Sequence, residues 1–234
     1  MTDLPEKTAA ASTGGASGVN EREVRQVATV SLVGASVEWF DFFLFGTAAA
    51  LVFPKLFFAT ASPTTSVLLS FGTFGIGFLA RPLGGIVWGG HFGDKIGRKK
   101  AFLTALLLMA GASFLIGVLP TAASIGIAAP ILLTVLRFAQ GLAVGGQWGG
   151  AALMATEFAP AHKRGFYGSF AQLGVPIGVL LGLSAYFLLF QQMGPESFLS
   201  YGWRLPFIAS VLFVGVVIYT KNRLEETPGV QEPE

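Results

Sequence analysis

The chain of 234 residues contains no cysteine, few charged residues and only two histidines. The absence of cysteine excludes disulfides, iron–sulfur clusters and thiolate chemistry. Charged residues make up 12% of the chain, against about 25% in an average soluble domain, whereas 53% of the residues are hydrophobic. This composition predicts a protein that is surrounded mainly by lipid.

Between the few charged residues the sequence contains long apolar runs. A helix that crosses a hydrocarbon core about 30 Å thick needs roughly 17 to 25 apolar residues. The runs show no alternation of apolar and polar residues, so a membrane β-barrel does not fit them. We therefore predict an all-α membrane protein with six transmembrane helices, at about 27–53, 66–89, 101–119, 130–156, 166–190 and 204–220.

The flanking segments and the loops indicate the orientation of these helices. Residues 1–24 are rich in Ala, Ser, Thr and Gly without the apolar core of a signal peptide, which predicts a disordered tail. Residues 25–222 hold the bundle. Lys and Arg stay on the cytoplasmic side of short loops, so both termini are expected in the cytoplasm. This side holds eleven of the fifteen basic residues, namely Lys7, Arg22, Arg25, Lys95, Arg98, Lys99, Lys100, Lys163, Arg164, Lys221 and Arg223.

The same bias explains the net charge of +2, so we expect no nucleic-acid partner. The opposite loops hold only Lys55 and Arg204, while the two remaining arginines fall inside the predicted spans.

Charged residues inside the spans are the first candidates for function. At a rise of about 1.5 Å per residue, Glu38 and Asp41 lie roughly 16 and 21 Å deep on one helix face. Arg81 lies at a similar depth in the second span, and Arg137 and Gln147 lie in the fourth. Each ionisable group at such depth costs at least about 2.5 kcal/mol and usually marks an ion, proton or substrate path. The alternative is a buried ion pair that only fixes helix register.

The loop "GGHFGDKIGRKK", residues 89–100, carries a more specific pattern. It matches Gly-x-x-x-Asp-Arg/Lys-x-Gly-Arg/Lys-Arg/Lys, the signature between the second and third helices of the major facilitator superfamily. Glycines permit a tight turn, and the basic run anchors the loop in the cytoplasm. The matching residues, which we assign to a cytoplasmic gating motif, are Gly90, Asp94, Gly97, Arg98 and Lys99.

Nearly everything after residue 25 resembles the metabolite:proton symporter family, which includes carriers for shikimate, 2-oxoglutarate, citrate and proline or betaine. The resemblance is carried by "VEWFDFFLFGTAAALVFPKLFF", "ARPLGGIVWGGHFGDKIGRKK", "APILLTVLRFAQGLAVGGQWGGAALMATEFAP", "WRLPF" and "ETP". It implies twelve helices in two six-helix halves that rock around a central cavity in a bacterial inner membrane. The chain is then expected to be the N-terminal half, with 223–234 beginning the central cytoplasmic loop.

The resemblance also implies roles for single residues. Glu38 and Asp41 match the acidic pair of the first helix and are expected to couple protons. A carrier needs a carboxylate that gains a proton in a dry state and loses it in a wet one. Arg81, Arg137 and Gln140 match family positions in the second and fourth helices and are expected to bind substrate.

Three further positions complete the set. Glu157 and Arg164 match the family's cytoplasmic gate charges. Gln147 stands where the family usually has Glu, which calls a proton site at this position into question but leaves a group that can hydrogen-bond substrate.

The expected function is proton-coupled symport of a small carboxylate or zwitterion, without a metal or cofactor. The expected partners are the proton, the metabolite, the lipid bilayer and a C-terminal six-helix half. A membrane enzyme is disfavoured, since no His-Glu-x-x-His or nucleophile elbow occurs and both histidines, His91 and His162, fall in predicted loops. A truncated, non-transporting scaffold or substrate-sensing regulator remains the alternative.

Overall fold

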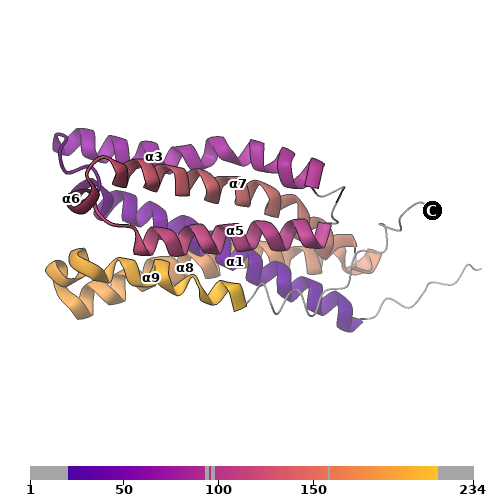
Figure 1. Ribbon diagram of the computed structural model, residues 1–234. Coiled ribbons are helices and arrows are strands. Elements are labelled where there is room, and N and C mark those ends of the chain that lie inside the picture. The colour runs from indigo at the N-terminus through magenta and orange to yellow at the C-terminus, as the bar shows by residue number, and fades with distance from the viewer. Residues whose placement is uncertain (1–20, 93–94, 96–97, 158, 216–234) are drawn as a thin grey trace, which may run out of the picture.

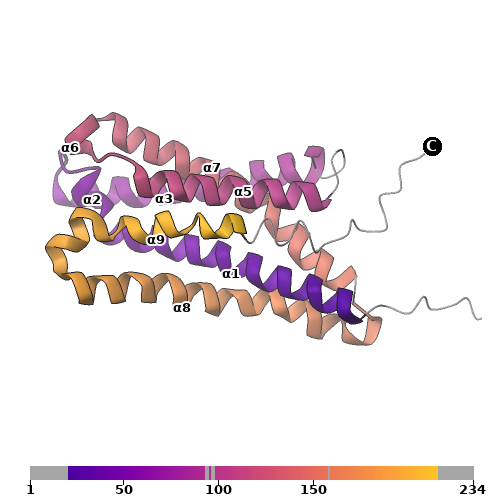
Figure 2. The same ribbon diagram turned by 60° about the horizontal axis from the view of Figure 1, so that its bottom comes forward.

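A computed structural model describes residues 21–92, 95, 98–157 and 159–215, and within these residues it contains helices and no strand. The long helices run side by side as one elongated bundle (Figures 1 and 2). In chain order the elements are α1 (Glu21–Leu51), α2 (Phe53–Leu56), α3 (Pro63–Gly84), η1 (Gly85–Phe92), α5 (Arg98–Val118), α6 (Ala122–Ile125), α7 (Ala128–Glu157), η2 (Ala161–Lys163), α8 (Arg164–Ser197), η3 (Phe198–Gly202) and α9 (Arg204–Ala209).

Four helical segments are long and apolar enough to cross a membrane, and two shorter apolar helices accompany them within the described residues. The four are Val24–Leu51, Pro63–Trp88, Ala128–Gly145 and Arg164–Gly202, and the two shorter ones are Leu103–Val118 and Arg204–Gly215. Each of the six apolar runs therefore corresponds to one helix of the bundle. The end of the sixth run, residues 216–220, lies outside the described residues.

The helix ends differ from the expected ends in three places. The helix α1 begins at Glu21, six residues before the apolar run, because polar residues can extend a helix beyond the hydrocarbon layer. The second span continues past α3 as the π-helix η1. The fifth continues to Ser197, but Gly194 interrupts it with a φ of 74°, and Pro195 then begins a new turn.

Glycine contacts hold the long helices close together. The helix α1 packs along α8, and α3 packs along α7. A Cβ atom at Gly178 of α8 would lie 2.5 Å from the carbonyl oxygen of Ser36. At Gly141 of α7 a Cβ atom would overlap the carbonyl oxygen of Gly77. Only glycine permits this backbone approach, as is common in membrane helix pairs.

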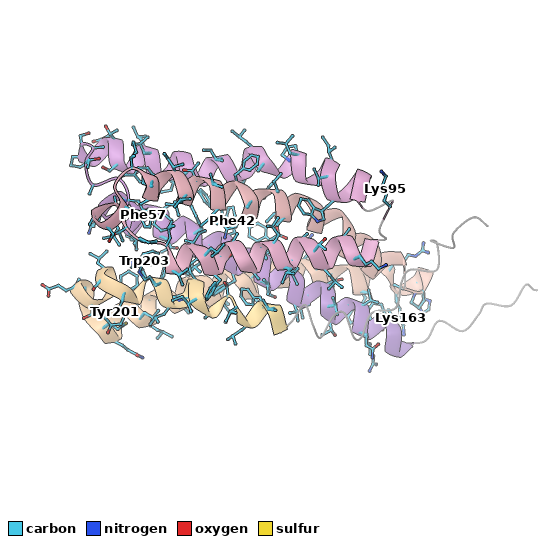
Figure 3. All side chains as sticks on the ribbon, in the orientation of Figure 1. Phe42, Phe57, Lys95, Lys163, Tyr201 and Trp203 are labelled. Atoms are coloured by element: carbon cyan, nitrogen blue, oxygen red, sulfur yellow. The ribbon has the colours of Figure 1, made fainter. Side chains whose placement is uncertain are left out.

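The two ends of the bundle differ in composition. Lys95 and Lys163 lie at one end, while Phe57, Tyr201 and Trp203 lie toward the other (Figure 3). This arrangement accords with the expected orientation, in which the lysine end faces the cytoplasm. We name as the aromatic end four fully or almost fully buried rings that meet edge to face or stacked, those of Phe53, Phe57, Trp203 and Phe207.

Arg204 ties two helices together beside the aromatic end. Its Nη1 donates hydrogen bonds to the carbonyl oxygens of Gly117, at 2.9 Å, and Leu119, at 2.7 Å. These carbonyls belong to the last turn of α5 and the residue after it, where no helical N–H is available to them. The guanidinium also lies over the ring of Trp203, 4.6 Å from its centroid. Arg204 therefore serves as the C-terminal cap of α5.

Candidate functional site

Both acidic residues of the first span face the interior of the bundle. Asp41 is 3% exposed and Glu38 is 6% exposed, as the i,i+3 spacing predicts for one helix face. Their neighbour Phe42 lies near the middle of the bundle's length, between its lysine end and its aromatic end (Figure 3). The carboxylates are therefore buried far from either end, where an ionised group needs partners.

Arg137 on α7 is the charged partner of Asp41. Its Nη1 lies 3.7 Å from Asp41 Oδ2, and its side chain is almost fully buried. Its guanidinium carbon lies 4.2 Å from the ring centroid of Phe45 and 4.8 Å from that of Phe74. Two aromatic rings thus hold the cation beside the carboxylate without supplying a competing negative charge.

Glycine makes room for this arginine. A Cβ atom at Gly77 of α3 would lie 2.8 Å from Arg137 Nε. Nε itself has no hydrogen-bond partner among the described residues. The carboxylate of Asp41 is also beyond direct hydrogen-bond distance of Arg137. Arg137 therefore retains donors that can bind a second anion.

Gln140 and Ser113 join the pair into one network. Gln140 accepts a hydrogen bond from Arg137 Nη1 at 3.1 Å and donates from Nε2 to both Asp41 oxygens at 3.0 Å. The same nitrogen donates to Ser113 Oγ at 2.7 Å, and Ser113 Oγ donates to Asp41 Oδ1. We call Asp41, Ser113, Arg137 and Gln140 the polar centre; each is at most 4% exposed.

Arg81 occupies a different position from Arg137. Its guanidinium carbon lies 4.6 Å from the ring centroid of Phe78 and 5.4 Å from that of Phe42. It interacts electrostatically with Glu38 rather than with Asp41. Arg81 is only partly buried, and Phe78 is 43% exposed. The structure therefore brings the expected site residues together as two pairs: Asp41 with Arg137, both buried, and Glu38 with Arg81, of which only Arg81 is partly exposed.

Gln140, which the resemblance assigns to substrate binding, has its amide hydrogen-bonded to protein side chains. Both ends of its amide are occupied within the polar centre, and the residue is 1% exposed. Among the gate residues, Arg164 is exposed and begins α8. Gly90, Arg98, Lys99, Gln147 and Glu157 lie in helices, but their side chains are outside the description, and Asp94 and Gly97 lie outside the described residues.

Sequence reasoning missed three residues of the site: Ser113 in the polar centre, and Phe45 and Phe74, whose rings lie beside Arg137. Ser113 stands in the apolar stretch "MAGASFLIG", where a small hydroxyl carries little signal. The two phenylalanines are hidden among 22 in the chain. The one signal that could have identified these rings is the buried Arg137, because a buried guanidinium commonly packs against aromatic rings.

A helical membrane bundle with a buried acid–base pair at mid-length is the architecture of a secondary transporter. The chain belongs to the sugar (and other) transporter family, which matches residues 27–229. This result confirms the resemblance to the major facilitator superfamily and the expected all-α membrane fold. It also agrees with the expectation of a transporter rather than an enzyme.

Bacterial relatives are similar over most of the chain. The inner membrane metabolite transport protein YhjE of Escherichia coli is 48% identical over 90% of this chain and 47% of its own length. The shikimate transporter of Escherichia coli is 47% identical over 87% and 46%, respectively. A proline/betaine transporter of Salmonella typhimurium is 38% identical over 92% and 42%. The chain thus spans about half the length of these relatives. One of them is named as an inner-membrane protein, in agreement with the inner-membrane location expected for this chain.

Solved structures agree on the fold. The inward-open xylose transporter XylE from Escherichia coli has a TM-score of 0.73 at 16% identity, over 88% of this chain and 48% of that one. The proton:xylose symporter XylE bound to 6-bromo-6-deoxy-D-glucose has a TM-score of 0.72 at 19% identity, over 89% and 46%. At this identity the likeness establishes the fold alone.

Proposed function

We propose that the chain is part of a proton-coupled symporter for a small organic metabolite, a carboxylate or zwitterion, which works by alternating access. The observation that carries this proposal is the buried Asp41–Arg137 pair at the middle of the bundle. Ionisable residues within a membrane are rare, pair with one another and mark proton and substrate paths. The relatives that transport shikimate, proline and betaine support the substrate class.

Asp41 is the proposed proton site. When ionised, it balances the charge of Arg137, 3.7 Å away. When a proton binds, the carboxyl becomes neutral and the attraction to Arg137 falls, which leaves a cation that attracts an anion. Binding of a proton to Asp41 therefore favours binding of a carboxylate substrate beside Arg137. Reciprocal coupling between the two ligands is what symport demands.

The partly exposed Arg81 supplies the proposed first contact with substrate. Arg81 lies over the rings of Phe42 and Phe78, and the exposed Phe78 provides apolar surface next to the positive charge. A small metabolite with a carboxylate and an apolar body fits such a surface. We assign Arg81 to substrate binding and Glu38 to the electrostatic balance of Arg81.

A second six-helix bundle would complete the cavity. Substrate sites of repeated transporters lie near the midplane between units, and one unit rocks against the other. The relatives have about as much chain again as the part that matches here. Under this proposal the side of α1 and α3 that carries Phe42, Phe78 and Arg81 faces that second bundle. The cytoplasmic gate residues, among them Arg164, would close the opposite access route.

Uptake into membrane vesicles from cells that express the gene tests the proposal. Labelled shikimate, proline, betaine and small dicarboxylates are offered with and without an inward proton gradient. We expect gradient-driven accumulation of one of them, and its loss in Asp41→Asn, since the amide keeps the shape but binds no proton. Substrate binding without flux would instead identify a substrate-sensing regulator.

A further inference from the structure

The direction of every hydrogen bond in the polar centre follows from Arg137. A guanidinium only donates. The atom of Gln140 that meets Arg137 Nη1, at 3.1 Å, must therefore be the amide oxygen. This fixes the amide nitrogen of Gln140 on the side of Asp41 and Ser113, so the usual ambiguity between amide oxygen and nitrogen is removed.

Ser113 inherits its direction from Gln140. The amide nitrogen lies 2.7 Å from Ser113 Oγ and can only donate, so the hydroxyl oxygen accepts there. The single hydrogen of the hydroxyl then points to its other close neighbour, Asp41 Oδ1. Since the amide carries two hydrogens, its second N–H is shared between the two oxygens of Asp41, each 3.0 Å from the nitrogen. All hydrogen bonds that the described residues give Asp41 thus run toward the carboxylate.

This arrangement suits the ionised acid and conflicts with the protonated one. A protonated carboxyl carries an O–H that needs an acceptor, and a buried donor without one is costly. The nitrogens of Arg137 and Gln140 cannot accept. Of these three neighbours, only the hydroxyl of Ser113 can change from donor to acceptor, by rotation about its Cβ–Oγ bond.

We propose that Ser113 is a positioning residue for proton coupling, whose hydroxyl reverses its hydrogen bond with Asp41 in each proton cycle. It donates to the ionised carboxylate and accepts from the protonated carboxyl. The inference rests on the proposed role of Asp41 as the proton site. The arriving proton bonds to an Asp41 oxygen and cancels its charge, while no covalent bond of Ser113 is broken.

The hydroxyl hydrogen of Ser113 needs a new acceptor in the protonated state. Helical serine and threonine residues commonly donate to the carbonyl four positions earlier. In this chain Ser36 donates to the carbonyl of Leu32, and Thr47 to that of Phe43, both at 2.8 Å. The equivalent acceptor for Ser113 is the carbonyl of Met109 on α5. The hydroxyl oxygen of Ser113 can then accept from Asp41 and Gln140 at once, because it has two lone pairs.

Charged or titratable groups on three helices surround the polar centre. Arg81 on α3 interacts electrostatically with Arg137 and with Glu38 on α1, and Tyr186 on α8 interacts electrostatically with Asp41. Ser113 is the contribution of α5 and is uncharged. Its replacement by alanine therefore leaves every charge in place, and a changed pH response reports the hydrogen bond.

Infrared difference spectroscopy on the full chain in lipid vesicles tests the proposal without a transport assay. The carbonyl band of protonated Asp41, assigned by its absence in Asp41→Asn, is followed from acid to alkaline pH. Under the proposal Ser113→Ala removes a charge-assisted hydrogen bond from the ionised carboxylate and a weaker, neutral one from the protonated carboxyl. We therefore expect the midpoint to move upward by up to about 1 pH unit. We also expect the carbonyl band of protonated Asp41, which reports the reversed bond, to move to a higher frequency. Ser113→Thr retains the hydroxyl and should restore the original midpoint.

Ser70→Ala is the matched control. Ser70 is also fully buried and donates to a backbone carbonyl, that of Ala49, at 2.7 Å. It should leave the midpoint unchanged. An unchanged carbonyl band frequency or an unchanged midpoint in Ser113→Ala, or equal shifts in Ser70→Ala, would overturn the proposal. If Ser113→Ala does not fold, Ser113→Cys replaces it, because a thiol is a weak donor, and a smaller upward shift is expected.

The two proposals fail separately. Proton-driven uptake with an unchanged Asp41 midpoint in the Ser113 variants would overturn the role of Ser113 and leave the symporter intact. A shifted midpoint together with uptake that ignores the proton gradient would support the hydrogen-bond reversal and overturn the symporter.

Discussion

The polar centre and the aromatic end are both buried, but different forces hold them together. At the aromatic end, rings such as those of Phe53 and Trp203 meet edge to face with centroids 5.9 Å apart. This packing depends on contact area and shape, and it has one best arrangement. In the polar centre the contacts are directional and depend on whether Asp41 is charged. One end of the bundle is thus built to stay fixed, and its middle can occupy two states.

Removal of one charge from the polar centre should have the largest effect. Arg137→Met leaves Asp41 as a buried carboxylate without its cation, and breaking such a pair costs about 3 to 5 kcal/mol. Unfolding by denaturant in detergent micelles would measure this loss. The double variant Asp41→Asn/Arg137→Met should recover most of the stability. A double variant as unstable as the single one would show that packing, not charge, holds the polar centre.

Truncation at the aromatic end should cost stability without a change in proton binding. Trp203 is fully buried among Phe53, Phe57 and Phe207. Trp203→Ala should therefore lower the free energy of unfolding by about 3 kcal/mol. The infrared midpoint of Asp41 should stay where it is. A moved midpoint would mean that the two regions are coupled rather than independent.

Crowding of Arg137 should produce an intermediate effect. A Cβ at Gly77 would lie 2.8 Å from Arg137 Nε, whereas a Cβ at Gly75 on the same helix would have no neighbour within 4 Å. Gly77→Ala should destabilise the bundle by about 1 to 3 kcal/mol and disturb Asp41 titration. Gly75→Ala should be neutral or stabilising by up to about 1 kcal/mol. Equal thermal unfolding of the two variants would contradict the close approach.

Single cysteines at the two ends should have the smallest effect on stability, within about 0.5 kcal/mol. Both Ala123 and His162 are exposed. Ala123 lies in α6, at the end of the bundle opposite to Lys163, the neighbour of His162 (Figures 1 and 3). In whole cells a membrane-impermeant thiol reagent with access to the outer face of the inner membrane should label Ala123→Cys and not His162→Cys. The reverse pattern would invert the orientation of the lysine end and the aromatic end.

Sequence reasoning found the charged members of the polar centre because a charge in an apolar run is costly and therefore conspicuous. Asp41, Glu38 and Arg137 were expected inside the bundle, and the structure buries all three. The pairing of Asp41 with Arg137 rather than Arg81 does not follow from the sequence, since both arginines lie inside predicted spans. It depends on how far α3 and α7 stand from α1.

The neutral members could not be found in this way. Ser113 lies 72 residues from Asp41 in the chain, and a serine in a membrane helix needs no special partner, because it can bond its own backbone. The same limit applies to helix ends. Apolar composition indicates where lipid begins, but the extension of α1 to Glu21 and the break at Gly194 depend on local backbone preferences.

The cap that Arg204 provides has a consequence for how the protein is made. The two carbonyls to which Arg204 donates at the end of α5 precede it in the chain by 87 and 85 residues. A ribosome therefore releases the third long helix into the membrane well before its capping residue has been synthesised. Until the sixth helix enters, those carbonyls depend on water or lipid headgroups at the surface. Capping of the third long helix by Arg204 therefore waits for insertion of the sixth helix. The hydrogen bonds of an early helix are completed only in the last step of assembly.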